Sequence, residues 1–238
     1  MIKGANPPKL QDAIKKLVAE ADGAEGYGLA GGAGSWLGAA APQGYGDVTS
    51  EVDVRGLDLL NSSSEFGGAR SLFQSSQPAT LEAGKGKSKA TQQDEGKDWV
   101  QSDTDEQLML YIPLQATIKV HSLHITSLPQ KAEEDDEAPM RPKTIKLYTN
   151  RTNVLGFDEA DDLAETQAFT LNTSDWDEKT GTVVLPLRFV KFQAVYSLVV
   201  FVVDGDGDGE AVRLDRMRIF GEVGEKRDQG KIEKISHD

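Results

Sequence analysis

The segment Asp204-Gly205-Asp206-Gly207-Asp208-Gly209 has the residue types and the spacing of a calcium-binding loop. Asp204, Asp206 and Asp208 would supply carboxylates at alternate positions, and Asp215 stands at the twelfth position, where an EF-hand loop places its last ligand. An EF-hand loop joins two helices and ends in a bidentate Glu, whereas this segment lies between two apolar runs that are typical of strands. We therefore expect a glycine-rich loop with solvated carboxylates and keep the four aspartates as a weak calcium candidate.

The remaining reactive residue types form no catalytic pattern. His121 and His124 are expected on opposite faces of a strand, which disfavours a two-histidine metal site. The chain has no cysteine, so a thiol nucleophile, a disulfide and a cysteine-based zinc site are excluded. With 39 acidic residues, a pair of carboxylates does not by itself indicate acid–base catalysis. The sequence predicts no catalytic residue, no cofactor and no enzyme activity.

The C-terminal residues 224–238 form a charged tail with two sizeable apolar residues, Ile232 and Ile235. Two apolar side chains cannot offset the entropy of ordering this segment, so we expect a flexible tail. A partner could nevertheless order it, with the two isoleucines as anchors and His237 and Asp238 as polar or metal contacts. These four are the partner-binding residues that the sequence predicts.

Composition limits the partners and the compartment. The formal net charge is −13 and the isoelectric point is near 4.7, which argues against nucleic acid as a partner. The sequence does not open with the pattern of a secretory signal, and the apolar run from Thr182 to Val203 is interrupted by Arg188, Lys191 and Gln193. We expect a soluble monomer that contacts no membrane, in the cytoplasm or, alternatively, also in the nucleus.

The apolar run from Thr182 to Val203 is expected to form two strands and the centre of the fold. Its second half is apolar on both faces, which predicts a strand in the middle of a sheet. Further strands are expected at 107–112, 117–128, 144–149, 166–171 and 211–223, with Pro113 ending the first and a bulge or bend near His121 and Ser122. About eight strands without long helices predict an all-β fold, a jelly-roll-like sandwich of the galactose-binding-like type.

The other segments are expected to be a helix, linkers and loops. Residues 1–21 carry an apolar stripe at helical spacing, and residues 22–46 are rich in Gly and Ala, as in a poorly ordered linker whose deletion would leave the sandwich stable. The sandwich is placed at 47–223. A disordered insertion at 74–97 and an acidic loop at 130–140 are expected within it.

Several stretches resemble the PITH domain, the proteasome-interacting module of thioredoxin-like proteins. They are Ser102–Leu108, Arg141–Tyr148, Phe157–Ala160, Leu185–Gln193 and Arg216–Gly221. The first helix resembles the last helix of a thioredoxin domain, but the Cys-x-x-Cys of that domain is absent. The resemblance implies a module that docks a thioredoxin-like protein onto the regulatory particle of the proteasome.

An alternative function is a small-ligand or carbohydrate-binding module, because jelly rolls bind sugars at loop tips where aromatic and carboxylate side chains meet. The candidate loops contain few aromatic residues. Trp176 is the exception. The proteasome-docking module is therefore the main prediction and the carbohydrate module the alternative.

Overall fold

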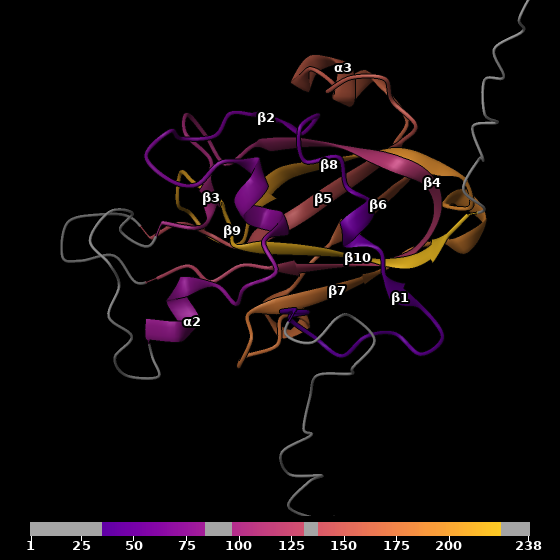
Figure 1. The fold of residues 1–238 in the computed structure, drawn as a ribbon. Helices are drawn as coiled ribbons and strands as arrows, with labels where there is room; N and C mark the ends of the chain where they lie inside the picture. Colours follow the sequence, from indigo (N-terminus) through magenta and orange to yellow (C-terminus); the bar gives the residue numbers. More distant parts are fainter. Residues whose placement is uncertain (1–34, 84–96, 131–137, 225–238) are drawn as a thin grey trace, which may run out of the picture.

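A computed structural model describes residues 35–83, 97–130 and 138–224 (Figure 1). The helix expected at residues 1–21 and the predicted partner-binding residues of the tail lie outside the described residues. So do residues 131–137 of the acidic loop.

Two antiparallel layers share one long strand, β4 (Leu108–Thr126). The first half of β4 pairs with β2 (Asp58–Leu60) and β8 (Val195–Gly205), and the layer continues through β5 (Pro142–Thr149) to β6 (Gln167–Thr170). The second half pairs with β7 (Thr182–Pro186) and β10 (Arg216–Val223), and β10 pairs with β1 (Gly46–Asp47). The predicted all-β, jelly-roll-like sandwich is confirmed.

Short elements join these strands. They are β3 (Val100–Gln101) with its partner β9 (Arg213–Leu214), the helices α2 (Ala79–Ala83) and α3 (Phe157–Asp162), and the 3₁₀ turns η1 (Thr49–Glu51), η2 (Ala69–Phe73), η3 (Thr173–Asp175) and η4 (Phe189–Lys191). No helix in the described part of the chain is long and apolar enough to cross a membrane.

Pro113 does not end a strand, contrary to the prediction. The register shifts between Pro113 and Ile118, and the chain then continues extended into the other layer. Proline is tolerated here because the bend interrupts the ladder hydrogen bonds that its missing N–H could not make. The predicted bulge near His121 is confirmed, since Phe220 and Gly221 pair with Ser122 and Val120 across an unpaired His121.

The strand β8 is buried on both faces, as predicted. Val200 and Val202 face the main core between the two layers. Val199 and Phe201 face a second apolar cluster, which also contains Ala160 of α3. Tyr148 joins this cluster and donates a hydrogen bond from Oη to the Ala160 carbonyl at 2.7 Å. Two-sided burial therefore explains why this stretch does not alternate between apolar and polar residues.

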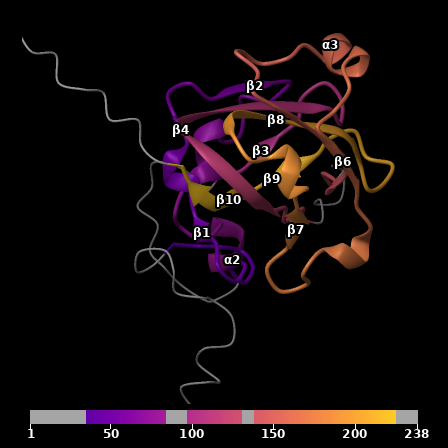
Figure 2. The same ribbon diagram turned by 90° about the vertical axis from the view of Figure 1, so that its right-hand side faces the viewer.

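The expected disorder at 22–46 and 74–97 is wrong for residues 35–46 and 74–83. We call residues 35–45 and 74–83 the cover, because they lie over the outer face of the layer that contains β10 (Figure 2). Trp36 and Leu37 are buried in the cover, and Trp36 N donates to the Ser75 carbonyl at 2.7 Å. Deleting the chain through residue 46 would remove these contacts, so the structure leads us to expect that the deletion lowers stability.

Candidate functional site

The outer face of the β10 layer is polar although it is buried. Along β10, Met217 and Ile219 face the main core, while Arg216, Arg218 and Phe220 face the cover. In the paired strand β4, the residues opposite these three are Thr126, His124 and Ser122, and all are buried. Buried polar groups must be hydrogen-bonded, and the cover supplies partners for the two arginines and for His124.

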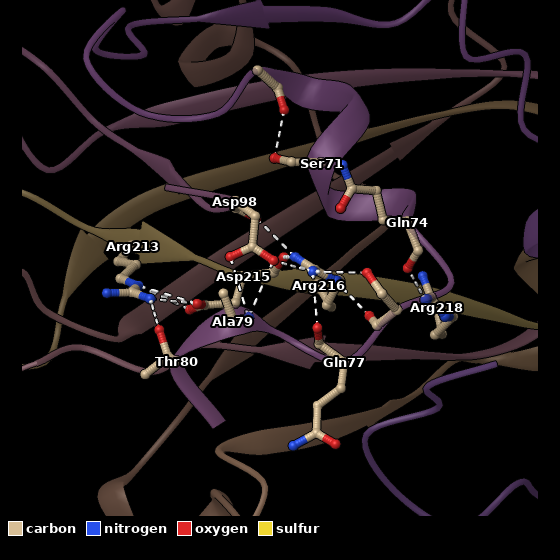
Figure 3. Close-up of polar contacts among 12 residues, drawn as sticks. Ser71, Gln74, Gln77, Ala79, Thr80, Asp98, Arg213, Asp215, Arg216 and Arg218 are labelled. Atoms are coloured by element: carbon tan, nitrogen blue, oxygen red, sulfur yellow. Dashed lines mark hydrogen bonds and ion pairs between the residues drawn. The ribbon is translucent and has the colours of Figure 1, made fainter. Parts of the chain in front are cut away.

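Arg213 forms a buried ion pair with Asp215 at one end of this face (Figure 3). Its Nη2 lies 2.6 Å from Asp215 Oδ1 and donates to Thr80 Oγ1 at 2.7 Å. The guanidinium carbon is 3.8 Å from the ring centroid of Trp99, in cation–π geometry. Asp215 Oδ2 also accepts a hydrogen bond from Leu128 N at 2.8 Å. This pair therefore links α2, β9 and the end of β4.

Arg216 binds three separate parts of the chain (Figure 3). Its Nε donates to the Ser76 carbonyl at 2.9 Å, and Nη1 donates to the Asp98 and Asp215 carbonyls at 2.8 Å each. Its Nη2 forms an ion pair with Asp98 Oδ2. The same carboxylate accepts from Ala79 N at the start of α2. Arg216 thus fixes the second segment of the cover to β10.

Arg218 holds both segments of the cover through carbonyl groups. Nε donates to Trp36 O at 2.7 Å, Nη2 donates to Gln74 O, and Nη1 donates to Met217 O at 2.8 Å. Burial lowers the pKa of Arg218 from its ordinary value to about 10, the charge of Asp47 opposes this shift, and Arg216 adds to it. The side chain stays protonated near neutral pH and works as a fixed donor of hydrogen bonds.

His124 and Gly38 show how closely the cover approaches the sheet. His124 Nδ1 lies 3.1 Å from the Leu37 carbonyl, so this nitrogen carries the proton and donates. Its Nε2 is buried and has no hydrogen-bond partner in the described chain. Gly38 has a φ of +74°, and a Cβ atom there would lie 2.6 Å from Thr182 Oγ1. Only glycine fits this contact without displacing the cover.

We predict that His124 makes the protein less stable below pH 6.5. Burial lowers its pKa, and His121 adds to this, whereas the Leu37 carbonyl and Asp47 act in the opposite direction. Because the folded-state pKa lies below the unfolded value of about 6.5, only the unfolded chain binds the proton as the pH falls below that value. The free energy of unfolding should then decrease by up to about 1.4 kcal/mol per pH unit from this group, until the folded-state pKa is reached.

Urea unfolding of the wild type and of His124→Asn at pH 7.5 and 5.5 measures this effect. An asparagine amide can still donate to the Leu37 carbonyl but does not titrate. The variant should lose less stability than the wild type between the two pH values. Equal losses would show that His124 does not contribute.

The four calcium-candidate aspartates are not arranged as one site. Asp215 is buried in its ion pair with Arg213. Asp204 Oδ1 accepts from Thr144 N at 2.7 Å, and Asp206 Oδ2 accepts from Thr173 Oγ1 at 2.8 Å. Asp208 is exposed. No group of three or more His, Asp or Glu side chains within the described ranges is placed to hold a metal ion.

The two strand histidines both contact the cover, which the sequence did not predict. His121 stacks on Tyr45 with ring centroids 4.0 Å apart, and His124 binds the Leu37 carbonyl. The bulge adds one residue to β4 at His121, which reverses the alternation of side chains between the two faces of the strand. His121 and His124 therefore both point toward the cover. The predicted contacts of His237 and the rest of the tail cannot be placed, because those residues lie outside the described chain.

An exposed apolar turn between β7 and β8 is the most prominent surface feature. We call residues 188–191 the tip. Val190 is 87% exposed and Phe189 is 48% exposed, although the sequence pattern places both in a core strand. Their neighbours Leu187 and Phe192 are buried and anchor the two ends of the turn. Arg188 and Lys191 flank the apolar pair, and neither is in an ion pair with a described residue.

Trp176 does not present its ring to a surface site. It is 3% exposed, belongs to the main core, and lies under Arg141, whose guanidinium carbon is 5.3 Å from the ring centroid. A cleft of about 550 Å³ adjoins it, lined mainly by β6, η3 and β7. A sugar-binding site usually offers an exposed aromatic face, so the buried ring disfavours the carbohydrate alternative at this cleft.

A comparison with known protein families identifies the family of this chain. A sequence model of the PITH domain matches residues 38–237, which is most of the chain. The chain belongs to the PITH domain family. The match begins at Gly38, so the cover lies within the PITH match except for residues 35–37.

A relative of this PITH chain is Thioredoxin-like protein 1 of Schizosaccharomyces pombe, which is 32% identical over 235 residues, 99% of this chain and 69% of the relative. Among solved structures, the C-terminal domain of a chitobiase from Bacteroides fragilis matches with a TM-score of 0.42 and 10% identity, covering 71% of this chain and 95% of that domain. A fucose-binding module from Streptococcus pneumoniae matches with a TM-score of 0.41 and 10% identity, covering 70% and 93%.

Proposed function

We propose that this PITH chain is a protein-interaction module that docks a thioredoxin-like protein onto the regulatory particle of the proteasome. The observation that carries the proposal is the family match over residues 38–237, together with the likeness to a thioredoxin-like protein over 99% of the chain. The family resemblance supplies the proteasome as the partner. The chain itself has no cysteine and therefore adds no dithiol chemistry.

The chemistry of the described residues supports a binding module rather than an enzyme. The buried ionisable groups are committed to one another or to the cover: Arg213 to Asp215, Arg216 to Asp98, and Arg218 to two cover carbonyls. The hydrogen bonds of Arg216 and Arg218 hold the cover against the β10 layer. We propose that the chain has no catalytic activity and acts as a monomer in the cytoplasm, with the nucleus as a second location.

The C-terminal tail is the second part of the proposal. Ile232 and Ile235 would anchor it on the partner, and His237 with Asp238 would make the polar or metal contacts. Gly224 N donates to Thr117 O at 3.1 Å, so the tail leaves the sandwich at the end where β4 bends. Deleting residues 230–238, and separately changing His237→Ala, should each weaken retention on the proteasome. Unchanged retention in both variants would contradict a role for the tail.

The test of the main proposal is co-migration of the purified chain with purified 26S proteasome in size-exclusion chromatography. Isolated 20S core particle, which lacks the regulatory particle, is the control. The proposal predicts that the chain elutes with the 26S particle and not with the core particle. Elution of the chain at its own volume in both mixtures would overturn the proposal.

A further inference from the structure

The geometry points to the tip, residues 188–191, as the contact that inserts into an apolar pocket rimmed by carboxylates on the partner. This inference rests on the proposed docking function and adds to it the surface and the chemistry of the recognised site. Phe189 and Val190 would enter the pocket, and Arg188 and Lys191 would meet its acidic rim.

The apolar pair of the tip is unusually exposed. Val190 at 87% and Phe189 at 48% are the two most exposed of the large hydrophobic residues in the described chain. Single exposed apolar residues are common, but two adjacent ones at a projecting turn form an anchor of the kind found at interface hot spots. Phe192, the residue after the tip, is fully buried. The same turn therefore buries one aromatic side chain and leaves Phe189 and Val190 exposed to solvent.

Hydrogen bonds hold the tip in one conformation. Arg188 N donates to Gln167 Oε1 at 2.8 Å, and Gln193 Nε2 donates to Phe189 O at 2.7 Å. Lys191 uses both of its nitrogens, because N donates to Arg188 O at 2.8 Å and Nζ donates to Thr166 O at 2.7 Å. A turn that is ordered before binding loses less conformational entropy in the complex, which favours affinity.

The charge of the tip differs in sign from that of the whole chain. The chain carries a net charge of −13, yet the tip places two cations beside its apolar pair. The described ion pairs involve neither Arg188 nor Lys191, so no described carboxylate neutralises either charge, although Lys191 Nζ also donates to Thr166 O. A tip that carries two cations and two apolar side chains is complementary to an apolar pocket with an acidic rim. The acidic remainder of this protein would repel such an acidic partner surface, which disfavours binding through other parts of the chain.

The tip lies at the same end of the sandwich as the last residues of β10. Ile118 pairs with Val223 of β10 on one side and with Val195 of β8 on the other, so the tip, the start of β8 and the end of β10 share one end of the sandwich. This is the right-hand end in Figure 1, where β4 turns from one layer to the other. Tyr196 and Val223, at 46% and 40% exposed, add apolar surface there. The proposed tail contact therefore begins beside the tip.

The test measures binding of variants to purified 26S proteasome by biolayer interferometry. Phe189→Ser with Val190→Ser should weaken binding at least about tenfold, because hot-spot anchors dominate interface affinity. The matched control is Val184→Ser, an exposed valine (43%) of β7 that lies outside the tip. The control should bind like the wild type, and thermal unfolding should verify that all variants are folded.

A second pair of variants tests the charge argument. Arg188→Glu with Lys191→Glu should weaken binding at least about tenfold and reduce its dependence on salt concentration. Lys143→Glu with Lys179→Glu changes the net charge equally at exposed positions near the other end of the sandwich, and should have a small effect. Wild-type binding that persists in both tip variants would overturn the inference while leaving the docking function intact. Absence of binding by the wild type would overturn both.

Discussion

Arg216→Met is expected to lower the free energy of unfolding by about 3–5 kcal/mol, because it breaks a buried ion pair and leaves its partners without a donor. The guanidinium is 1% exposed and binds the Asp98 carboxylate and the carbonyls of Ser76, Asp98 and Asp215. Methionine keeps an unbranched, flexible side chain, but it is shorter than arginine and donates no hydrogen bond. The second segment of the cover would lose its main attachment to β10.

Urea unfolding of Arg216→Met against Arg55→Met measures this loss. Arg55 is exposed, so the same substitution there should change stability by less than about 0.5 kcal/mol. Asp98→Ala combined with Arg216→Met should cost less than the sum of the single changes, because the two side chains form one ion pair. A loss below about 1 kcal/mol for Arg216→Met would show that the cover is held by other contacts.

Val200→Asp is expected to abolish soluble expression. Val200 is 1% exposed in the middle of β8, between Leu110 of β4 and Leu147 of β5, and faces the main core. An unpaired carboxylate there costs several kcal/mol, which is of the order of the whole stability of a domain. Phe201→Asp should have a similar but smaller effect, because Lys146 Nζ lies 5.7 Å from the Phe201 ring and could approach the new carboxylate.

Val190→Asp is the matched control for this prediction, since the same substitution at the exposed tip should leave the fold intact. Soluble expression and the fluorescence-detected melting curve distinguish the variants. A Val200→Asp protein that is soluble and unfolds cooperatively would contradict the assignment of β8 as the centre of the fold.

The sequence predicts the strands well where burial alone determines the pattern. Strand β8 is apolar on both faces because both faces are buried. The alternation of apolar residues in β4 changes phase at His121 because a bulge lies there. Both features can be recognised from the order of apolar and polar residues in the sequence. The position of Phe189 and Val190 could not be predicted in this way. Two apolar residues that follow a strand have the same local pattern whether the chain turns them inward or outward, and here the buried Leu187 and Phe192 take the core positions.

The buried arginines were also missed, because most of their partners are backbone carbonyls. A carbonyl group has no sequence signature, so Arg218 gives no sign in the sequence that it binds Trp36 O and Gln74 O. The available signal is the alternation of Arg216 and Arg218 with Met217 and Ile219. Charged residues at every second position of a strand usually face water. Arg216 and Arg218 are buried because the cover lies over this face of β10.

Site-specific photo-crosslinking is the most direct test of the docking account. A benzophenone amino acid at position 190 places the reactive group on the tip, and the same amino acid in place of the exposed Lys179 places it near the other end of the sandwich. After irradiation with purified 26S proteasome, the account predicts crosslinks from position 190 to subunits of the regulatory particle and few or none from position 179. Equal crosslinking from both positions, or none from position 190 while the chain is bound, would contradict it.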